Sequence, residues 1–490
     1  MPIVAIQAPI WSLSVLARGL MPEILSSESL PADVFDVVVI GAGVVGCAMA
    51  RRFALEGART LVIEKSMDLL DGASKGNSAI LHTGFDAPPP DSQEHGCLVD
   101  GYHEYREIHA RLNLPLLECG ALVLAWSGEE AERLHMLRHN AHRNGVTSAH
   151  IINAKQVRRR EPEVADSVLA ALEIPGESII DPWSAPYAYM LQALQNGASL
   201  ARQCALVGGR FDGETWSLET SRGKLCSRLV INCAGLYGDR VNRLLVGESD
   251  FGIRPRKGQF VVFDKSARPL LRSILLPVPT EITKGIVVCP TIFGNVLVGP
   301  TAEEQDSRSD ARVDAQELQA LVERGTQILP ALSRHGVTAT YAGIRPASEH
   351  KDYQIKWYPG QRYCCVGGIR STGLSAALGI ASRVHGEYRD QGNRHVAPEK
   401  CVWPQVAGIA ETAKRDWQES GNDGIVCHCE LVTRREINQA LDGPLAPGGM
   451  AGLKRRTRAG MGRCQGFYCS AELCELTEGR LSQSLAVARK

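Results

Sequence analysis

The sequence lacks several features that mark broad classes of protein. Its 54 basic and 54 acidic residues leave no net charge over 490 residues, which argues against a globally basic nucleic-acid-binding protein. It has no apolar run close to the roughly 20 residues that a membrane-spanning helix needs. It also has no internal repeat and no low-complexity tract. At roughly 150 residues per domain, we therefore expect a globular protein of about two to four domains that binds no nucleic acid.

The opening segment, residues 1–34, also lacks the pattern of a secretory signal. Prolines interrupt it repeatedly, and no charged start is followed there by an apolar core and a small-residue cleavage site. We interpret the segment as an N-terminal extension without an assigned use. The sequence favours a cytoplasmic location, and peripheral association with the inner face of a membrane stays open.

Cysteine is present in moderately high number, at 15 residues. Most of these cysteines stand singly in apolar stretches, as Cys47, Cys204 and Cys289 do, rather than in a repeating framework. A chain of this length has ample core and needs no disulfide staples. We therefore expect mostly buried thiols in a reducing compartment.

A βαβ unit is the first firm element of the sequence. Asp36–Ile40 is rich in β-branched residues and ends abruptly at Gly41, which is typical of a buried parallel strand. Helical spacing follows over 44–57, and a second short strand follows over 60–64. Strand and helix patterns then alternate through the middle of the chain, which predicts a second, mixed-sheet domain interleaved with the first.

The turn inside this unit matches GxGxxG, with glycines at Gly41, Gly43 and Gly46. The first permits the tight turn, the second lets the backbone approach a pyrophosphate, and the third lets helix and strand pack closely. Glu64 closes the next strand and can accept a hydrogen bond from a ribose hydroxyl, while the helix N-terminus would stabilise phosphate charge. The pattern predicts dinucleotide binding but does not separate flavin from nicotinamide.

Four further segments resemble a known family: Gly72–Ser78, Leu81–Gly84, Ile231–Leu236 and Gly367–Leu374. They look like the flavin-contacting segments of FAD-dependent glycerol-3-phosphate dehydrogenases and L-2-hydroxyglutarate oxidases, which are related to D-amino acid oxidases. The resemblance spans about residues 36–383 and makes FAD the expected cofactor. The residues that the glycine-rich turn and the resemblance place at FAD are Gly41, Gly43, Gly46, Glu64, Lys65, Ser74, Asn77, Ser78, Gly235, Gly368, Arg370, Ser371, Thr372, Gly373 and Leu374.

The last of these segments also has a physical reason to face a flavin. Its glycine-rich turn leads into a predicted helix from Gly373 to about Arg383. The positive end of that helix and the backbone donors at its start would stabilise the negative charge that reduction places on the flavin pyrimidine ring.

The resemblance implies two residues at the substrate. His82 stands where the family has a histidine beside the flavin, and the near-neutral pKa of a free imidazole suits a base or a hydrogen-bond donor to the substrate oxygen. Arg345 resembles the arginine that meets the anionic end of the substrate, where a guanidinium binds a carboxylate or phosphate through two parallel hydrogen bonds. Arg370 and Lys257 are weaker candidates for this contact.

The sequence departs from the glycerol-3-phosphate pattern just after His82. The family commonly continues there with an arginine and a tyrosine, whereas here Thr83-Gly84 is followed by Phe85 and Asp86. We expect an FAD-dependent dehydrogenase of a small anionic secondary alcohol, similar to glycerol 3-phosphate or a 2-hydroxy acid. An amine, amino-acid or opine dehydrogenase on the same scaffold stays open, as does a non-catalytic electron-transfer subunit.

Four cysteines near the C-terminus form two close pairs. Cys427 and Cys429 make a CxC pair, and Cys464 and Cys469 make a CxxxxC pair. Four thiolates in one small unit suit an iron-sulfur cluster or zinc. The arrangement resembles the bacterioferritin-associated-ferredoxin type of 2Fe-2S domain, which is found on the catalytic subunit of anaerobic-type glycerol-3-phosphate dehydrogenases and on opine-oxidising flavoproteins. We do not count Cys474 as a ligand.

This second resemblance implies a route for electrons. A cluster would carry electrons one at a time away from a flavin that collects two, toward a quinone, a carrier protein or a partner subunit of a hetero-oligomer. A zinc module for protein binding stays open as an alternative. The basic run from Lys454 to Arg458 would stabilise the cluster's charge or dock an acidic partner, but a solvated basic face is an equally good interpretation.

The predicted fold is α/β: a Rossmann-like FAD-binding domain with an interleaved mixed-sheet substrate domain and a small C-terminal iron-sulfur domain. The expected boundaries are an extension over 1–34, the oxidoreductase region over 35–392, a linker over 393–424 and the iron-sulfur domain over 425–490. Within the oxidoreductase region, the FAD-binding segments are expected at about 35–120, 200–250 and 340–392.

Overall fold

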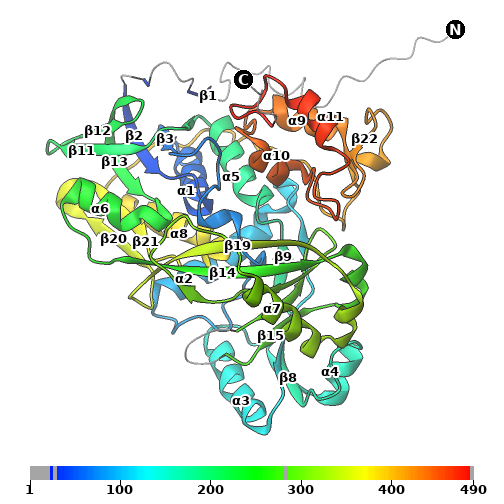
Figure 1. Ribbon diagram of the computed structural model, residues 1–490. Helices are drawn as coiled ribbons and strands as arrows, with labels where there is room; N and C mark the ends of the chain where they lie inside the picture. Colours follow the sequence, from blue (N-terminus) through cyan, green and yellow to red (C-terminus); the bar gives the residue numbers. More distant parts are fainter. Residues whose placement is uncertain (1–22, 26–29, 32, 280–284, 486–490) are drawn as a thin grey trace.

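The computed structural model describes residues 23–25, 30–31, 33–279 and 285–485. Two sheet-based lobes are stacked in it, and a small C-terminal unit packs beside the first lobe (Figure 1). The residues of the predicted N-terminal extension at positions 1–22, 26–29 and 32 lie outside the described ranges. Of the rest, Glu23–Ile24 forms an edge strand.

The first lobe is built on a nine-stranded sheet in the order β1-β10-β3-β2-β13-β12-β11, with β21 beside β13 and β20 beside β21. The strands from β1 to β13 on this path, together with β21, run parallel. The bounds are β1 (Glu23–Ile24), β2 (Val34–Ile40), β3 (Thr60–Ile63), β10 (Ser199–Ala201), β11 (Leu206–Phe211), β12 (Trp216–Thr220), β13 (Gly223–Asn232), β20 (Gln354–Tyr358) and β21 (Tyr363–Gly367).

Both faces of this sheet are covered, as the apolar strand at residues 36–40 predicts. Val37 and Val39 of β2 join the core beneath the helices α1 (Val44–Leu55), α5 (Ser184–Gln195) and α8 (Gly373–Asp390), which pack on one another. Val38 and Ile40 face the other way, into a core shared with α6 (Gly238–Val246). The predicted βαβ unit and the predicted helix that begins at Gly373 are confirmed.

Helix α2 (Gln93–Ile108) crosses α8 at very close range. A Cβ at Gly101 would lie 2.2 Å from the carbonyl oxygen of Ser375, and a Cβ at Gly379 would lie 2.0 Å from that of Cys97. The two glycines therefore allow a backbone approach that no larger residue permits, and this approach fixes the first turn of α8. Ser92 caps the start of α2, where its side chain accepts a hydrogen bond from the His95 N–H.

The second lobe contains another nine-stranded sheet, in the order β18-β14-β17-β16-β15-β6-β8-β7, with β19 paired to β14. Three helices cover it: α3 (Gly128–Arg143), α4 (Ala154–Arg160) and α7 (Ala315–Ile328). The strands are β6 (Ala121–Ala125), β7 (His150–Asn153), β8 (Ala170–Ile174), β14 (Ile253–Phe263), β15 (Ile274–Pro277), β16 (Val287–Pro290), β17 (Val296–Gly299), β18 (Glu303–Glu304) and β19 (Val337–Ser348).

A three-stranded sheet lies between the lobes, in the order β4-β9-β5. Its strands are β4 (Ile80–Leu81), β9 (Ser178–Ile180) and β5 (Leu116–Leu117), and β9 is antiparallel to both others. Leu81 stands opposite Ser178, so the next residue pair along the two chains is His82 and Glu177.

The C-terminal unit has its own small core. Its elements are β22 (Ile425–Cys427), β23 (Val432–Thr433), α9 (Arg434–Asp442), α10 (Met450–Thr457) and α11 (Ser470–Thr477). Thr433 and Glu436 form a reciprocal capping box at the start of α9. Residues 393–424 reach this unit as a strap that is held at several points, since Ile409 and Arg415 in it are only 2% exposed. The domain boundaries stay predictions.

The basic residues of α10 dock the C-terminal unit onto the first lobe. Arg456 forms a two-pronged ion pair with Asp68, with both nitrogen–oxygen distances at 2.8 Å, and its guanidinium lies 4.2 Å from the ring centroid of Tyr187. Arg455 donates to the carbonyl oxygen of Leu69 at 3.1 Å. The basic run from Lys454 to Arg458 was also interpreted as a solvated face. That interpretation is wrong for Arg455, Arg456 and Arg458, whose side chains point into the protein and contact acidic or aromatic residues.

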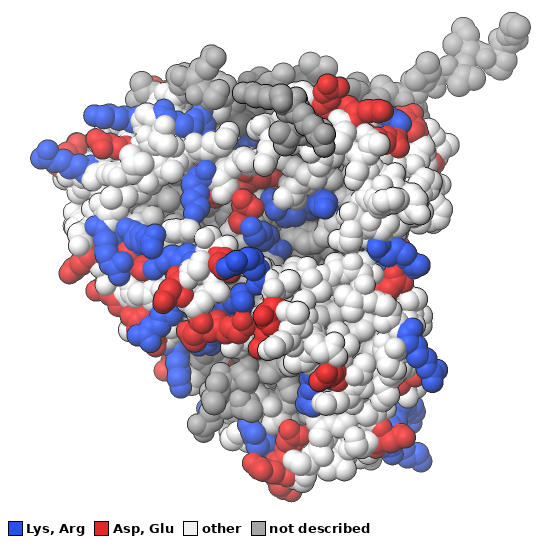
Figure 2. Space-filling model, in the orientation of Figure 1, with Lys and Arg blue, Asp and Glu red and all other residues white. Residues whose placement is uncertain are grey.

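Surface charge follows no single sign. Lysine and arginine side chains are interspersed with aspartate and glutamate over the face drawn in Figure 2.

Ten cysteines are buried and only Cys401 is exposed, so the prediction of mostly buried thiols is confirmed. Within the described ranges, no helix has both the length and the apolar character needed to cross a membrane.

Asp68→Ala tests the docking contact. It would leave the guanidinium of Arg456 in a buried site without its counter-charge, and we expect it to lower the free energy of unfolding by about 3–5 kcal/mol in a urea titration. Asp33→Ala is the matched control, because Asp33 pairs with Arg59 at an exposed site and its loss should cost under about 1 kcal/mol. Equal losses in the two variants would contradict the assignment.

Candidate functional site

A cavity of about 1000 Å³ lies where the first lobe meets β14 and β19 of the second. It is lined by every predicted flavin-region residue except Gly46 and Gly368, and therefore by residues from three well-separated parts of the chain. Gly46 has a supporting role, because a Cβ there would lie 1.9 Å from the carbonyl oxygen of Gly41. The lining residues that the sequence predicted are Gly41, Gly43, Glu64, Lys65, Ser74, Asn77, Ser78, His82, Gly235, Arg345, Arg370, Ser371, Thr372, Gly373 and Leu374.

One end of the cavity is formed by the glycine-rich turn and the start of helix α1. Helix α1 begins there after Gly43, which as a glycine has no side chain to cap the helix, and the first turn has no acidic residue. Glu64 is 8% exposed and accepts hydrogen bonds from the backbone N–H of Ala42 and of Ser66, both at 2.8 Å. Its carboxylate therefore fixes the glycine-rich turn, and its role as a ribose contact stays a prediction.

The loop over residues 72–78 forms a wall of the cavity and is held firmly. Ser74 Oγ accepts from the Val44 N–H at 3.0 Å, and Trp183 Nε1 donates to the carbonyl oxygen of Lys75 at 3.2 Å. The Tyr341 hydroxyl, which comes from β19, donates to the carbonyl oxygen of Asn77 at 2.6 Å. Contacts from both lobes thus set the position of this loop.

The N-terminus of a second helix, α8, also lines the cavity, although α8 lies near the C-terminal end of the oxidoreductase region in the sequence. Thr372, Gly373 and Leu374 at the start of α8 line the cavity, and the first turn of α8 has no acidic residue. The Arg370 side chain is 3.2 Å from Glu94, and Thr372 Oγ1 donates to the same carboxylate at 2.7 Å. Glu94 thus holds the turn before α8 in place and engages the guanidinium of Arg370.

His82 lines the cavity and rests on a buried carboxylate. Its Nδ1 lies 2.9 Å from Oε2 of Glu177, a residue that is completely buried. The His82 N–H donates to Ser375 Oγ at 2.9 Å, which ties the histidine to the first turn of α8. Glu177 was not predicted from the sequence, because a lone glutamate after an ordinary turn gives no signal and its neighbour is 95 residues away.

Arg345 also lines the cavity, as predicted, and its nearby groups leave its charge largely unneutralised. Within the described ranges it takes part in no ion pair, and it donates to the carbonyl oxygen of Thr301 at 3.1 Å. Burial, with a smaller contribution from Arg256, lowers the pKa of Arg345 to about 10. The guanidinium is therefore charged at neutral pH and suited to an anionic ligand. Gly258 leaves room for it, because a Cβ there would lie 2.5 Å from its Nη2.

The register of β14 and β19 explains which other basic residue lines the cavity next to Arg345. Arg256 on β14 stands opposite Arg345 on β19 and also lines the cavity, where Glu304 engages one side of it at 2.7 Å. Lys257 lies one residue further along, is not among the residues lining the cavity, and pairs with Glu303 at 3.1 Å. The alternation of side chains along β14 thus selects Arg256, a choice that the sequence alone did not allow.

The four C-terminal cysteines come together as two thiol pairs. Burial is the main cause that raises the pKa of Cys429 and of Cys469, and the neighbouring thiols of Cys464 and Cys427, respectively, raise it further. In the described part of the chain, no group of three or more Cys, His, Asp or Glu is close enough to hold a single metal ion. Two pairs, each able to bind one iron, therefore fit a two-iron cluster better than one zinc.

Backbone donors surround these thiols. The Gly460 N–H points at Cys427 Sγ at 3.4 Å, and a hydrogen bond from the Tyr468 N–H is the main cause that lowers the pKa of Cys464. A Cβ at Gly462 would lie 2.3 Å from the Cβ of Cys429. Donors of this kind stabilise the negative charge of a thiolate-bound cluster, so the residues fit such a group.

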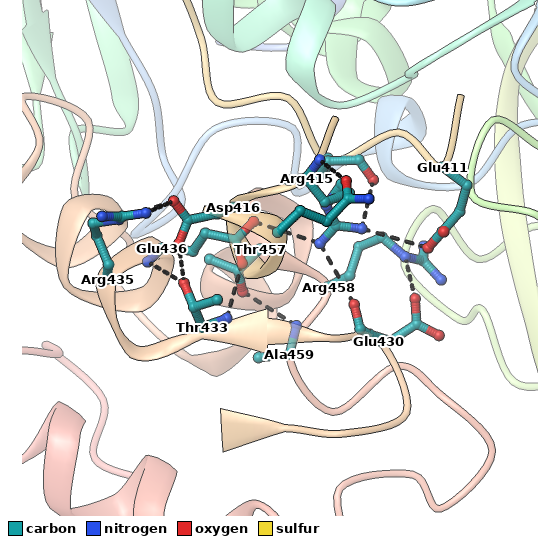
Figure 3. A network of polar contacts seen from close by, with 12 residues as sticks. Glu411, Arg415, Asp416, Glu430, Thr433, Arg435, Glu436, Thr457, Arg458 and Ala459 are labelled. Carbon is teal, nitrogen blue, oxygen red and sulfur yellow. Dashed lines mark hydrogen bonds and ion pairs between the residues drawn. The ribbon is translucent and has the colours of Figure 1, made fainter. Parts of the chain in front are cut away.

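A buried charge network supports the same loops (Figure 3). Glu430 follows Cys429 directly and accepts from Arg458 at 2.7 Å, and Lys265 of the second lobe lies 3.3 Å from the same carboxylate. Arg415 contacts Glu436 at 3.4 Å and the carbonyl oxygen of Glu430 at 3.5 Å. The strap, the cysteine loops and the second lobe are thereby linked through one set of charges.

Two family models match the chain. The model described as FAD dependent oxidoreductase matches residues 36–384, and the model described as BFD-like [2Fe-2S] binding domain matches residues 425–478. They confirm the predicted cofactors, FAD and a 2Fe-2S cluster, and the predicted fold class.

Curated relatives cover nearly the whole chain. A glycerol 3-phosphate dehydrogenase of Caloramator mitchellensis is 30% identical over 93% of this chain and 96% of its own length. One subunit of the anaerobic glycerol-3-phosphate dehydrogenase of Escherichia coli strain K12 is 25% identical over 90% and 88%. Among solved structures, the L-α-glycerophosphate oxidase of Mycoplasma pneumoniae superposes with a TM-score of 0.72 at 25% identity, covering 77% of this chain and 100% of that one.

A pair of cysteine variants tests the cluster ligands. We expect Cys464→Ser to remove nearly all iron and acid-labile sulfide from anaerobically purified protein, because one iron would lose a thiolate. Cys474→Ser is the control, since Cys474 lies in α11 outside the two pairs, and it should keep the wild-type content. Full iron content in Cys464→Ser, or its loss in Cys474→Ser, would change the assigned ligand set.

Proposed function

The chain belongs to the FAD dependent oxidoreductase family, and from this premise we propose that it is a dehydrogenase that oxidises glycerol 3-phosphate at its secondary alcohol. The observation that carries the proposal is the partly buried guanidinium of Arg345, which lines the same cavity as His82 and has no ion-pair partner within the described ranges. A second guanidinium, that of Arg256, faces it and suits a phosphate that carries two charges. The names of the relatives point the same way.

The residues of the chain divide the work of the reaction. Arg345 would hold the phosphate and set the orientation of the alcohol, and His82 would take the hydroxyl proton. When bound, FAD supplies the acceptor of the hydride and the cluster supplies a one-electron carrier. The N-terminus of α1 would hold the FAD pyrophosphate, and the N-terminus of α8 would meet the ring.

We further propose that electrons leave at the loop between Cys464 and Cys469. Phe467 and Tyr468 lie in this loop with exposed fractions of 80% and 78%, whereas Cys427 and Cys469 are buried. Exposed aromatic side chains are favourable contact residues for another protein. A partner subunit of a hetero-oligomer fits this loop, with a carrier protein or a quinone as the other acceptors. A cytoplasmic location, peripheral at the inner face of the membrane, stays a prediction.

An anaerobic substrate panel followed by visible spectroscopy tests the proposed function. Glycerol 3-phosphate should bleach the flavin and then reduce the cluster, whereas L-2-hydroxyglutarate, glycine and proline should leave both oxidised. Bleaching by an amino acid alone would favour an amine or amino-acid dehydrogenase. A flavin that no substrate reduces would favour a non-catalytic electron-transfer subunit.

Arg345→Gln tests the anion contact. Losing one partner of a desolvated charge pair costs about 2–5 kcal/mol, so we expect KM for glycerol 3-phosphate to rise by roughly 100-fold or more. Arg345→Lys should recover only part of this loss, because an ammonium cannot form the two parallel hydrogen bonds. The control is Arg312→Gln, an exposed arginine outside the cavity lining, which should leave KM unchanged. An unchanged KM in Arg345→Gln would remove Arg345 from the substrate site.

A further inference from the structure

We propose that Glu177 is a positioning residue for His82: it holds the imidazole with its proton on Nδ1, so that Nε2 is the atom that accepts the hydroxyl proton of the substrate. This inference deepens the proposed function and rests on it, because it concerns the proton step of the same reaction. It adds a residue for which neither the glycine-rich turn nor the resemblance gave any signal.

Both carboxylate oxygens of Glu177 form hydrogen bonds with His82 or its neighbour Thr83. Oε2 lies 2.9 Å from His82 Nδ1. Oε1 accepts from the backbone N–H of Thr83 at 2.6 Å and from Thr83 Oγ1 at 2.8 Å. The side chain of Glu177 is 0% exposed, so water does not compete for these contacts. A carboxylate this deeply buried and aimed at one imidazole nitrogen sets both the ring's orientation and its tautomer.

The backbone at Glu177 is fixed from several sides. The antiparallel register of β4 and β9, in which Leu81 faces Ser178, places Glu177 beside His82. The Gly120 N–H donates to the carbonyl oxygen of Glu177 at 2.9 Å, and the Tyr102 hydroxyl donates to that of Gly176 at 3.0 Å. A Cβ at Gly176 would lie 2.9 Å from Thr83 Cγ2 and 3.1 Å from the Tyr102 hydroxyl oxygen, so a larger residue there would have to displace these side chains.

The histidine is fixed on its other side by the flavin-facing helix. Ser375, in the first turn of α8, accepts from the His82 N–H at 2.9 Å and donates to the carbonyl oxygen of Ile80 at 3.2 Å. His82 is therefore held between Glu177 and the start of α8. Both supports belong to rigid elements, which is what a group acting on a small substrate needs.

The atoms that surround His82 determine which of its two ring nitrogens carries the proton. An ionised carboxylate only accepts hydrogen bonds, so Nδ1 must be the protonated nitrogen and Nε2 the basic one. Nε2 would take the hydroxyl proton as the C–O bond becomes a carbonyl, and FAD, when bound, would supply the acceptor for the carbinol hydrogen and its electron pair. The imidazolium formed at His82 then faces the negative charge of Glu177 at close range, which stabilises it.

A double-mutant cycle tests this role. We measure the rate constant of flavin reduction by saturating glycerol 3-phosphate in the wild type, Glu177→Gln, His82→Gln and the double variant. We expect Glu177→Gln to lower the rate by about 100-fold or more and to change KM by less than about 3-fold. In the His82→Gln background, Glu177→Gln should cost less than about 3-fold further, because the two residues act as one unit.

Glu161→Gln is the matched control. Glu161 is also 0% exposed and accepts from a backbone N–H, that of Arg272 at 3.0 Å, but it does not line the cavity. This variant should keep the wild-type rate. FAD content and melting temperature are measured for every variant. If Glu177→Gln does not fold, Glu177→Asp replaces it, because the shorter side chain keeps the negative charge but moves the carboxylate away from His82. Its expected loss is about 10-fold, again absent in the His82→Gln background.

A second readout does not depend on turnover. In protein labelled with 15N-histidine, the NMR signals assigned through His82→Gln should show the Nδ1–H form in the wild type and a larger share of the Nε2–H form in Glu177→Gln. Rate losses that multiply in the double variant, or an unchanged tautomer, would make Glu177 a structural residue only. If the wild type itself is not reduced by glycerol 3-phosphate, the proposed function fails, whereas the tautomer result still decides the contact between Glu177 and His82.

Discussion

The pairing of β4 with β9 is the contact on which the geometry of the cavity depends. These two short strands tie segments nearly 100 residues apart at the junction of the two large sheets. Their register brings His82 against Glu177, and Ser375 links His82 to the first turn of α8. A slip of one residue would turn these side chains to opposite faces. The positions of His82, Glu177 and the start of α8 in the cavity are therefore fixed together.

The negative groups at the cavity already have hydrogen-bond partners, whereas some of its positive groups do not have an acidic partner among the described residues. The buried carboxylates of Glu64, Glu94 and Glu177 all accept hydrogen bonds from nearby donors, so they shape the walls rather than repel an anion. The positive groups include the two helix N-termini and Arg345, which has only a carbonyl oxygen as its partner within the described ranges. Such a cavity favours ligands with phosphate or carboxylate groups.

Local sequence patterns were enough to predict the βαβ unit, the start of α8 and the paired cysteines, because each depends on neighbouring residues. His82 and Arg345 required the resemblance to a family, and the structure places both in the cavity, although their roles stay predictions. Glu177 and Arg256 could not be found, because strand registers between distant segments bring them to the site. The buried arginines of α10 were hidden for a similar reason, since a basic run shows nothing of the acidic partner it will meet.

The C-terminal unit touches both lobes at once. Arg456 pairs with Asp68 on the first lobe at 2.8 Å, and Arg463 pairs with Asp264, at the end of β14 on the second, at 2.9 Å. The unit thus acts as a brace across the junction that contains the cavity. Moving the lobes apart would therefore break either the buried pair of Arg456 with Asp68 or the more exposed pair of Arg463 with Asp264, so the position of the C-terminal unit and the width of the junction are coupled.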